Sequence, residues 1–368
     1  MHDLLALQQK AREAGRPLIG CFPPYPPLEL FTALGLTPLV LWNLGDWQDG
    51  VSHADRHVQV FACAVARRLA EACLGPAGAG FDALFAYNTC DTLRNLPEVI
   101  QRARPGLPLR RMHLPQTHPP QAHAQAYLAG ELRDLAAGLA ADLGVTCRPE
   151  ALAAAVARHE HLRALARQAG ELAHQGRLPF RRYARVMNQV WLSSLEHGEA
   201  LLGGLLAAAA AAPAPARAKV VLSGIEPPPG PLLGLLEEAG LRVVADDLAG
   251  LSRALHPGAA QPTELGAYYA DYYQGHHPCS TLLYSAERRR GLLPALARQS
   301  GAHGVIFVGE KFCECEYFEF PELAGELSRA GLPSLLLEVA LDDRANLEGF
   351  RTRVEAFAET ITPARKEG

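Results

Sequence analysis

Short apolar runs that end at turn residues recur in the first third of the chain, between Arg16 and about Pro115. Helix-like stretches separate these runs, so that strand and helix patterns alternate. This alternation is typical of a parallel sheet with crossover helices. The predicted strands are PLIGCF, TPLVLWN, FDALFAYN and LPLRRMHLP, and the predicted helices include Pro27–Leu34, His57–Cys73 and Asp91–Arg104.

The middle of the chain, residues 119–216, has no strand-like run. Ala, Leu, Arg, Glu and Gln recur there at helical spacing, as in PEALAAAVARHEHLRALARQ, which predicts a helical insertion or bundle. The region closes with AAAAAAPAPARA, which is typical of a helix end followed by a proline-stiffened linker. We therefore place a boundary near Pro215.

The last third, residues 217–368, returns to alternating strands and helices. Each predicted helix between these strands ends on glycine, the residue best suited to a left-handed C-terminal cap. The predicted strands are KVVLSGIE, LRVVADDL, HGVIFVGE and LPSLLLEV, and a closing helix covers about Asn346–Ile361. We predict an α/β fold of two Rossmann- or flavodoxin-like parallel-sheet domains, 1–118 and 217–368, with a helical region at 119–216 and the site between the domains.

Composition limits the classes of function. The 368 residues exceed the usual size of one domain, and 49% hydrophobic with 20% charged residues is typical of a globular protein. A net charge of −4 provides no basic surface for nucleic acid. The first twenty residues lack the apolar stretch of a secretory signal, and the most apolar run, Leu201–Pro213, is shorter than the roughly 20 residues that span a bilayer. We expect a cytoplasmic protein without a membrane segment.

Eight cysteines in such a chain require an explanation other than structural disulfides, which reducing conditions disfavour. Burial explains most single cysteines, whereas ligation of a metal or cluster explains a group of them. The cysteines are Cys21, Cys63, Cys73, Cys90, Cys147, Cys279, Cys313 and Cys315.

Two of the cysteines directly follow predicted strands. Cys90 follows DALFAYNT, Cys313 follows GVIFVGEKF, and a predicted helix comes after each. Ligands of open α/β sheets bind beyond the carboxyl ends of strands, and a helix N-terminus stabilises thiolate charge. We therefore expect a site at the interface of the two domains, with Cys63 on the preceding helix as the leading third ligand and Cys73 behind it.

Other common binding and catalytic motifs are absent or lie in the wrong context. The chain has no phosphate-loop, H-E-x-x-H or G-x-S-x-G motif, and the glycines of LGPAGAGF precede a strand, the wrong context for a dinucleotide. Zinc is disfavoured because the C-x-C of Cys313 has no second close pair.

Two further groups of polar residues have ordinary explanations. Glu314 and Glu316 need no catalytic role, because carboxylates favour the start of a helix. We expect solvated loop positions for the proline-flanked histidines His118, His123, His276 and His277.

Three segments resemble the 2-hydroxyacyl-CoA dehydratase and benzoyl-CoA reductase subunit family. They are GCFPPYPPLELFTALGLTPLVLW, YNTCDTLRNL and the block from GVIFVGEKFC through FPELAGELSRAGLPSLLLEV to RTRVEAFAE, and the resemblance extends along nearly the whole chain. The 27-residue step from Cys63 to Cys90 suits the family's first two cluster cysteines. The chain departs from the family at Cys313-Glu314-Cys315, where C-D-P or C-E-P is common.

The resemblance implies a [4Fe–4S] cluster on Cys63, Cys90 and Cys313, with the fourth iron open to water or substrate. It also places Glu29 near the substrate cavity as an acid–base candidate, although a carboxylate at a helix N-terminus is the simpler explanation. The related double-cubane proteins hold a larger [8Fe–9S] cluster with additional cysteines, for which Cys73, Cys279 and Cys315 are available.

The implied activity is one-electron chemistry on an acyl-CoA thioester. An electron added to the thioester carbonyl makes a ketyl radical that expels the 2-hydroxyl group and acidifies the β-hydrogen, which no ordinary base could remove. The resemblance implies a second homologous subunit in a heterodimer, or a homodimer, and a separate ATP-hydrolysing iron–sulfur activator. The alternatives are a benzoyl-CoA reductase-type subunit and a double-cubane protein that reduces small molecules.

Overall fold

The computed structural model describes most of the chain. The described residues are 4–47, 50–117, 121–146, 149–213, 215–216, 218–258, 264–282, 285–340 and 347–362.

The first sheet contains four parallel strands in the order β2-β1-β3-β4. Its strands are β1 (Leu18–Phe22), β2 (Thr37–Val40), β3 (Ala83–Tyr87) and β4 (Leu109–Met112). The helices of this part are α1 (Leu4–Arg12), α2 (Leu28–Ala33), α3 (Ala64–Leu74) and α4 (Asp91–Ala103), with short 3-10 turns at Leu44–Asp46, Ala54–Arg56 and Pro76–Gly80. Every residue of β1 and β3 is buried, as expected for central strands covered on both faces.

The second sheet repeats this topology with the order β6-β5-β7-β8, again parallel throughout. Its strands are β5 (Ala218–Gly224), β6 (Leu241–Leu248), β7 (Gly304–Glu310) and β8 (Ser334–Val339). The accompanying helices are α9 (Gly230–Glu238), α10 (Leu265–Gly275), α11 (Ala286–Ser300), α12 (Glu314–Arg329) and α13 (Leu347–Ile361), with a 3-10 turn at Ser252–Leu255.

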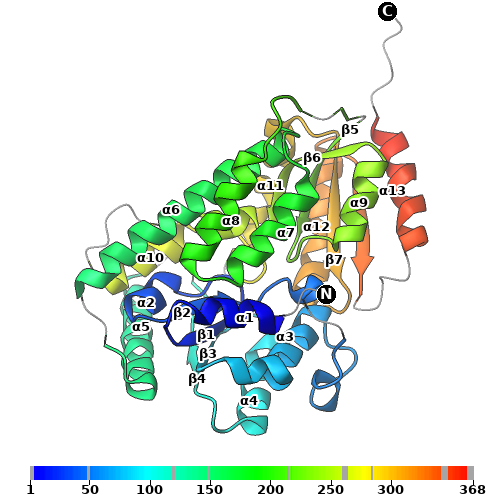
Figure 1. The fold of residues 1–368 in the computed structure, drawn as a ribbon. Helices are drawn as coiled ribbons and strands as arrows, with labels where there is room; N and C mark the ends of the chain where they lie inside the picture. The colour runs from blue at the N-terminus through cyan, green and yellow to red at the C-terminus, as the bar shows by residue number, and fades with distance from the viewer. Residues whose placement is uncertain are drawn as a thin grey trace, which may run out of the picture.

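Four helices separate the two sheets along the chain, namely α5 (Ala122–Leu143), α6 (Pro149–His174), α7 (Phe180–Trp191) and α8 (Leu195–Ala207). Helices α6, α7 and α8 pack against one another, and α6 also contacts α2 of the first part and β6 of the second. Figure 1 shows these three helices beside the second sheet and above the first.

Two buried tryptophan side chains join the first sheet and the helical region to the second sheet. The Trp42 Nε1 donates to the carbonyl of Ile225 at 2.7 Å, and the Trp191 Nε1 donates to the carbonyl of Gly250 at 2.8 Å. The larger of two apolar cores in the described residues runs from Leu4 to Ile361 through both sheets and the helices, and the smaller one lies against the second sheet. Continuous burial of this kind fixes how the two sheets face each other.

The predicted α/β fold class is confirmed, and all eight predicted strands are present. Gly240, Gly301 and Gly331 follow helices with φ of 73°, 66° and 71°, as predicted for left-handed caps. The helix predicted at His57–Cys73 was wrong at its start, because residues 57–62 form turns and α3 begins at Ala64. Helices α1 and α10 were not predicted.

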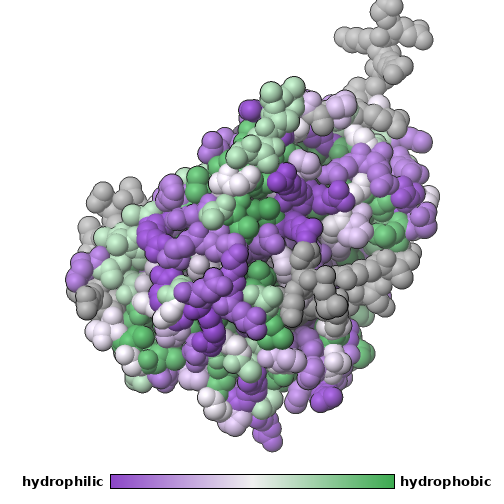
Figure 2. Space-filling view, in the orientation of Figure 1, coloured by the Kyte–Doolittle hydropathy of each residue, from purple (hydrophilic) through white to green (hydrophobic). Residues whose placement is uncertain are grey.

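No helix in the described part of the chain is long and apolar enough to cross a membrane. Figure 2 shows hydrophilic and hydrophobic residues interspersed over one face of the molecule.

Candidate functional site

Two of the predicted cysteines, Cys90 and Cys313, lie beyond the carboxyl ends of strands, where ligands of such sheets bind. Cys90 follows β3 and Cys313 follows β7, each the strand next to the first strand of its sheet. The strand order reverses at this position in both sheets, and the carboxyl ends of strands at such a switch point form the usual ligand crevice.

Each of the three predicted ligands is the N-cap residue of a helix. Cys63 caps α3, Cys90 caps α4 and Cys313 caps α12. The prediction that Cys63 lies within a helix was therefore wrong, since its backbone is extended, with φ −60° and ψ 157°. Three positive helix ends are thus available to stabilise negative charge on sulfur.

The structure brings these three cysteines together with Cys315. Negative charge on Cys90 is close enough to raise the pKa of both Cys63 and Cys313, and charge on Cys63 also raises the pKa of Cys313. Cys315 donates a hydrogen bond to the Cys90 sulfur, which is the main reason why the pKa of Cys90 falls to about 6. Backbone N–H groups of Leu93 and Thr92 lower this pKa further. The lowered pKa of Cys90 and the raised pKa of Cys315 belong to the pair, and they favour the negative charge on the Cys90 sulfur.

The other cysteines of the group are neutral thiols without a metal. Burial is the largest cause that raises the pKa of Cys63 to about 12, and it also raises the pKa of Cys313. For Cys315 the bond to Cys90 is the largest cause of a raised pKa. Since only thiolates bind metals, loading of this group must release protons.

Buried carboxylates surround the cysteines. Glu316 accepts hydrogen bonds from the backbone N–H groups of Ile225, at 2.8 Å, and Glu310, at 2.9 Å, and burial raises its pKa to about 7. It thereby ties the start of α12 to the ends of β5 and β7. Glu314 and Glu316 do begin a helix, as predicted. Glu226, whose pKa burial also raises, joins the two parts by accepting from the Asn43 N–H at 2.9 Å.

The remaining cysteines have other surroundings. Cys21 lies within β1, and Cys73 is fully buried near Arg104, where burial raises its pKa to about 12. Cys279 is fully buried and contacts Arg253 and Thr281 at 3.2 Å each. Cys147 lies outside the described residues.

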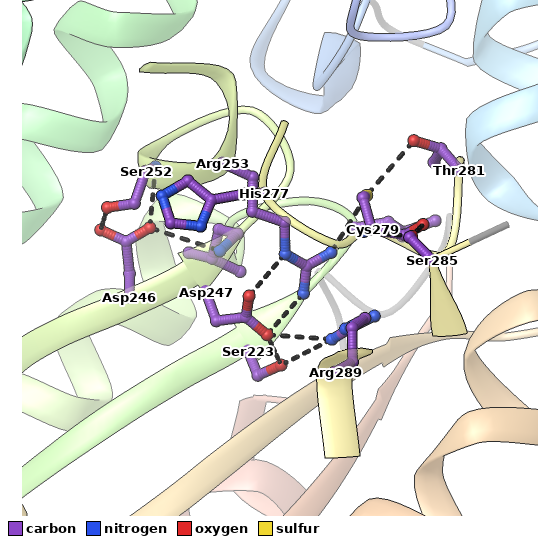
Figure 3. A network of polar contacts seen from close by, with 12 residues as sticks. Ser223, Asp246, Asp247, Ser252, Arg253, His277, Cys279, Thr281, Ser285 and Arg289 are labelled. Carbon is purple, nitrogen blue, oxygen red and sulfur yellow. Dashed lines mark hydrogen bonds and ion pairs between the residues drawn. The ribbon is translucent and has the colours of Figure 1, made fainter. Parts of the chain in front are cut away.

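Cys279 belongs to a buried ionic network that was not predicted from the sequence (Figure 3). Asp247, near the end of β6, accepts two hydrogen bonds from Arg253, at 2.6 and 2.7 Å, and one from Arg289 at 2.9 Å. Two arginines hold the pKa of Asp247 at about 2 against the effect of burial, the largest cause, which raises it. The pair of aspartates at the end of the strand pattern LRVVADDL was the only local signal.

Glu29 lies in the first turn of α2 and is fully buried. It forms an ion pair with Arg163 of α6 and accepts hydrogen bonds from the hydroxyls of Tyr268, at 3.2 Å, and Tyr269, at 2.8 Å. Burial, the largest cause, raises its pKa, but Arg163 and His159 outweigh it and the result is about 2. Glu29 is therefore an ionised acceptor that joins α2, α6 and α10, and its acid–base role stays a prediction.

The histidine prediction was wrong in part. His123 and His277 are exposed, as expected, but His276 is buried, with its ring 4.2 Å from that of Tyr25. His118 lies outside the described residues.

Comparison with known proteins gives matches over nearly the whole chain. Residues 23–361 match the family model described as 2-hydroxyglutaryl-CoA dehydratase, D-component. The chain is 26% identical over 364 residues to the (R)-phenyllactyl-CoA dehydratase beta subunit of Clostridium sporogenes, covering 96% of this chain and 94% of that protein. It is 27% identical to the beta subunit of lactoyl-CoA dehydratase from Anaerotignum propionicum, covering 97% and 95%, and 26% identical to the C subunit of benzoyl-CoA reductase from Thauera aromatica, covering 97% and 94%. With the family model matched over nearly its whole length, this chain belongs to the 2-hydroxyglutaryl-CoA dehydratase D-component family.

Proposed function

We propose that this chain is the subunit of a 2-hydroxyacyl-CoA dehydratase that holds a [4Fe–4S] cluster on Cys63, Cys90 and Cys313. The observation that carries the proposal is the meeting of these cysteines, from distant parts of the sequence, at three helix N-termini. The names of the relatives, among them phenyllactyl-CoA and lactoyl-CoA dehydratases, support the class of substrate.

The residues present suit an iron–sulfur cluster. Such clusters are held by cysteine thiolates, and hydrogen bonds and burial around the sulfurs adjust their potential. Cys63 is 6% and Cys313 is 7% exposed, so water has little access to either sulfur. Among the described residues no three His, Cys, Asp or Glu side chains lie close enough to share a single metal ion. The ligands of a cluster stand further apart, because several iron and sulfur atoms lie between them.

The chain itself would hold and shield the reacting groups. When bound, the cluster would supply the single electron for the ketyl-radical loss of the 2-hydroxyl group and an iron that acts as a Lewis acid. The N-termini of α3, α4 and α12 stabilise the negative charge of the sulfurs. Glu316 holds the start of α12 in place through two backbone N–H groups, so that Cys313 keeps its direction.

Exposed apolar side chains near the cysteines support a partner subunit. Val60 and Phe61 precede Cys63, and Phe312 precedes Cys313; these three side chains are between 51% and 67% exposed. Large apolar residues at a surface commonly mark an interface. The relatives are named as beta or C subunits, which favours a second, homologous subunit over a homodimer. Electrons would come from a separate ATP-hydrolysing activator, since the chain has no phosphate-loop motif.

Two alternatives rest on particular observations. The benzoyl-CoA reductase relative matches at nearly the same identity as the dehydratases, so a reductase-type subunit is the second candidate. The contact of Cys315 with Cys90 provides a fourth thiol and is the observation in favour of a double-cubane protein. The other spare cysteines, Cys73 and Cys279, have the separate surroundings described above.

The test is metal analysis of anaerobically purified protein. We expect a brown, oxygen-sensitive protein with about four iron per chain, acid-labile sulfide and an EPR signal on reduction. The variants Cys63→Ser, Cys90→Ser and Cys313→Ser should each lose most of the iron, whereas Cys21→Ala, a buried thiol within β1, should retain it. Zinc without sulfide, or equal iron in all four variants, would contradict the proposal.

A further inference from the structure

A cavity of about 490 Å³ lies where α6, α7, α9 and β6 meet. Its sheet residues, Leu241–Val243, are the first three of β6, whereas Cys313 follows the end of the parallel strand β7. The cavity therefore lies at the amino ends of the strands of the second sheet, and Cys313 lies at their carboxyl ends. The size falls in the ordinary range of small-molecule sites.

The floor of the cavity is apolar. The floor residues come from the α6–α7 connection, α7, α9 and β6, and all of them are buried residues of the core. They are Leu178, Phe180, Leu233, Leu236, Leu241 and Val243. Such a floor provides contact area for a hydrocarbon chain or ring and provides no hydrogen-bond partners for a sugar.

Positive charge borders this floor. Arg177, Arg181 and Arg242 line the cavity, against the single acidic residue Glu237, which lies 3.9 Å from Arg181. Three arginines against one carboxylate leave this part of the cavity wall positively charged, and positive charge favours an anionic ligand.

The start of α7 adds to this charge. Its N-cap residue is Pro179, whose side chain has no acceptor for the first backbone N–H groups of the helix. Pro179, Phe180 and Arg181 all line the cavity. The positive end of a 12-residue helix therefore faces the same space as the arginines.

We propose that this cavity binds an amphipathic monoanion, a carboxylate that carries an apolar chain or ring. Its head would lie at Arg242, Arg181 and the start of α7, and its apolar part against Leu236 and Val243. A polyphosphate has no apolar part for this floor, and a neutral lipid has no charge for the arginines. The ligand would join the helical region to the second sheet and stabilise the folded protein by mass action.

The experiment measures binding of decanoate to the purified holoprotein, with its partner subunit if one copurifies, by calorimetry and by thermal unfolding under anaerobic conditions. Decanol and inorganic phosphate serve as matched probes that lack the charge and the chain respectively. We expect saturable binding of decanoate at one site per chain with a raised Tm, and weaker effects of both other probes.

Variants identify the site. Arg242→Met keeps the length of the side chain and removes its charge, and should weaken decanoate binding about tenfold or more, the usual scale for a charge-assisted hydrogen bond. Arg181→Met, at an exposed position, should also weaken decanoate binding. It provides the test if Arg242→Met fails to fold. Arg329→Met, in the last turn of α12, is the control and should bind as the parent protein does.

Three results would overturn the proposal: no saturable binding of decanoate, equal binding of decanol, or unchanged affinity in both arginine variants that line the cavity. Inorganic phosphate that binds as tightly as decanoate would also overturn it, because the apolar floor would then have no role.

Discussion

Replacing Glu29 by glutamine removes the carboxylate that neutralises Arg163 and keeps the side chain nearly the same shape. The Arg163 side chain is 4% exposed and would remain buried with only the more distant Glu160 carboxylate, 3.7 Å away, as a counter-charge. Tyr268 donates to Oε1 and Tyr269 to Oε2, so only one of the two hydroxyls can still donate to the single amide oxygen of glutamine. The expected result is a large loss of stability that originates mainly from the buried charge of Arg163, which loses its close partner.

Two independent arguments give the same magnitude. Removing one partner of a buried ion pair typically costs about 3–5 kcal/mol. A fully buried carboxyl whose pKa falls from 4.5 to about 2 on folding contributes about 3 kcal/mol at neutral pH. Because the pKa is lowered, this contribution is complete above about pH 4.5 and is lost as the pH falls towards 2.

The assay is urea unfolding at pH 7.5 and at pH 4, followed by circular dichroism under anaerobic conditions. Glu196→Gln is the matched control: burial, the largest cause, raises the pKa of Glu196, but its own backbone N–H, Arg158 and Arg16 outweigh it and the result is about 2, while its side chain is 52% exposed. Solvent screening should limit the cost of the control to less than about 1 kcal/mol. A double variant, Glu29→Gln with Arg163→Met, should recover part of the lost stability, since it leaves no buried charge.

Activity measurements separate a structural role from a catalytic one. If Glu29 joins helices only, the folded fraction of Glu29→Gln should retain most of its kcat. A loss of less than about 1 kcal/mol for Glu29→Gln, or an equal loss for Glu196→Gln, would refute the reasoning from burial. Unchanged stability with abolished kcat would instead support the acid–base role implied by the family resemblance.

Three further predictions concern the cysteine site. Alkylation of Cys90 by iodoacetamide in the metal-free protein should rise through about pH 6, in line with its lowered pKa, and a rise near pH 9 would contradict the thiolate. Cys315→Ala should retain about four iron per chain yet shift this alkylation to higher pH, because it removes the donor whose bond to Cys90 is the main cause of the low pKa; iron loss as severe as in Cys90→Ser would favour the double-cubane alternative. Dehydration of a 2-hydroxyacyl-CoA should need only a catalytic amount of low-potential reductant, whereas ring reduction should consume reductant in proportion to product, and turnover in oxidised buffer would exclude the radical mechanism.

Local pattern determined the secondary structure well. Buried parallel strands are continuous apolar runs and their crossover helices have a period near 3.6, so all eight strands were found without tertiary information. Glycines at helix ends were equally informative, because a left-handed cap is a local requirement. Helix α10 was missed because four tyrosines in AYYADYYQG give no clear helical polarity; all four are buried in the fold.

The sequence also located the cysteines after strands, because the position of a residue relative to a strand end is local. It could not place the start of α3 at Ala64, which makes Cys63 a cap and not a helix residue. The contact of Cys315 with Cys90 was equally hidden, since Cys90 precedes α4 beside the first sheet and Cys315 lies in α12 beside the second. Only the packing of the two sheets decides which of the spare cysteines joins the group.

Only the tertiary structure determines which acidic side chain pairs with which arginine. Glu29 and Arg163 are 134 residues apart, and Asp247 meets Arg289 across 42 residues. A carboxylate in the first turn of a helix has the same local sequence whether it faces solvent or a buried arginine. Its pKa depends on burial and on the charges within a few ångströms. Those surroundings arise only when helices distant in the sequence pack against one another, and they determine which of these residues stabilise the fold and which bind ligands.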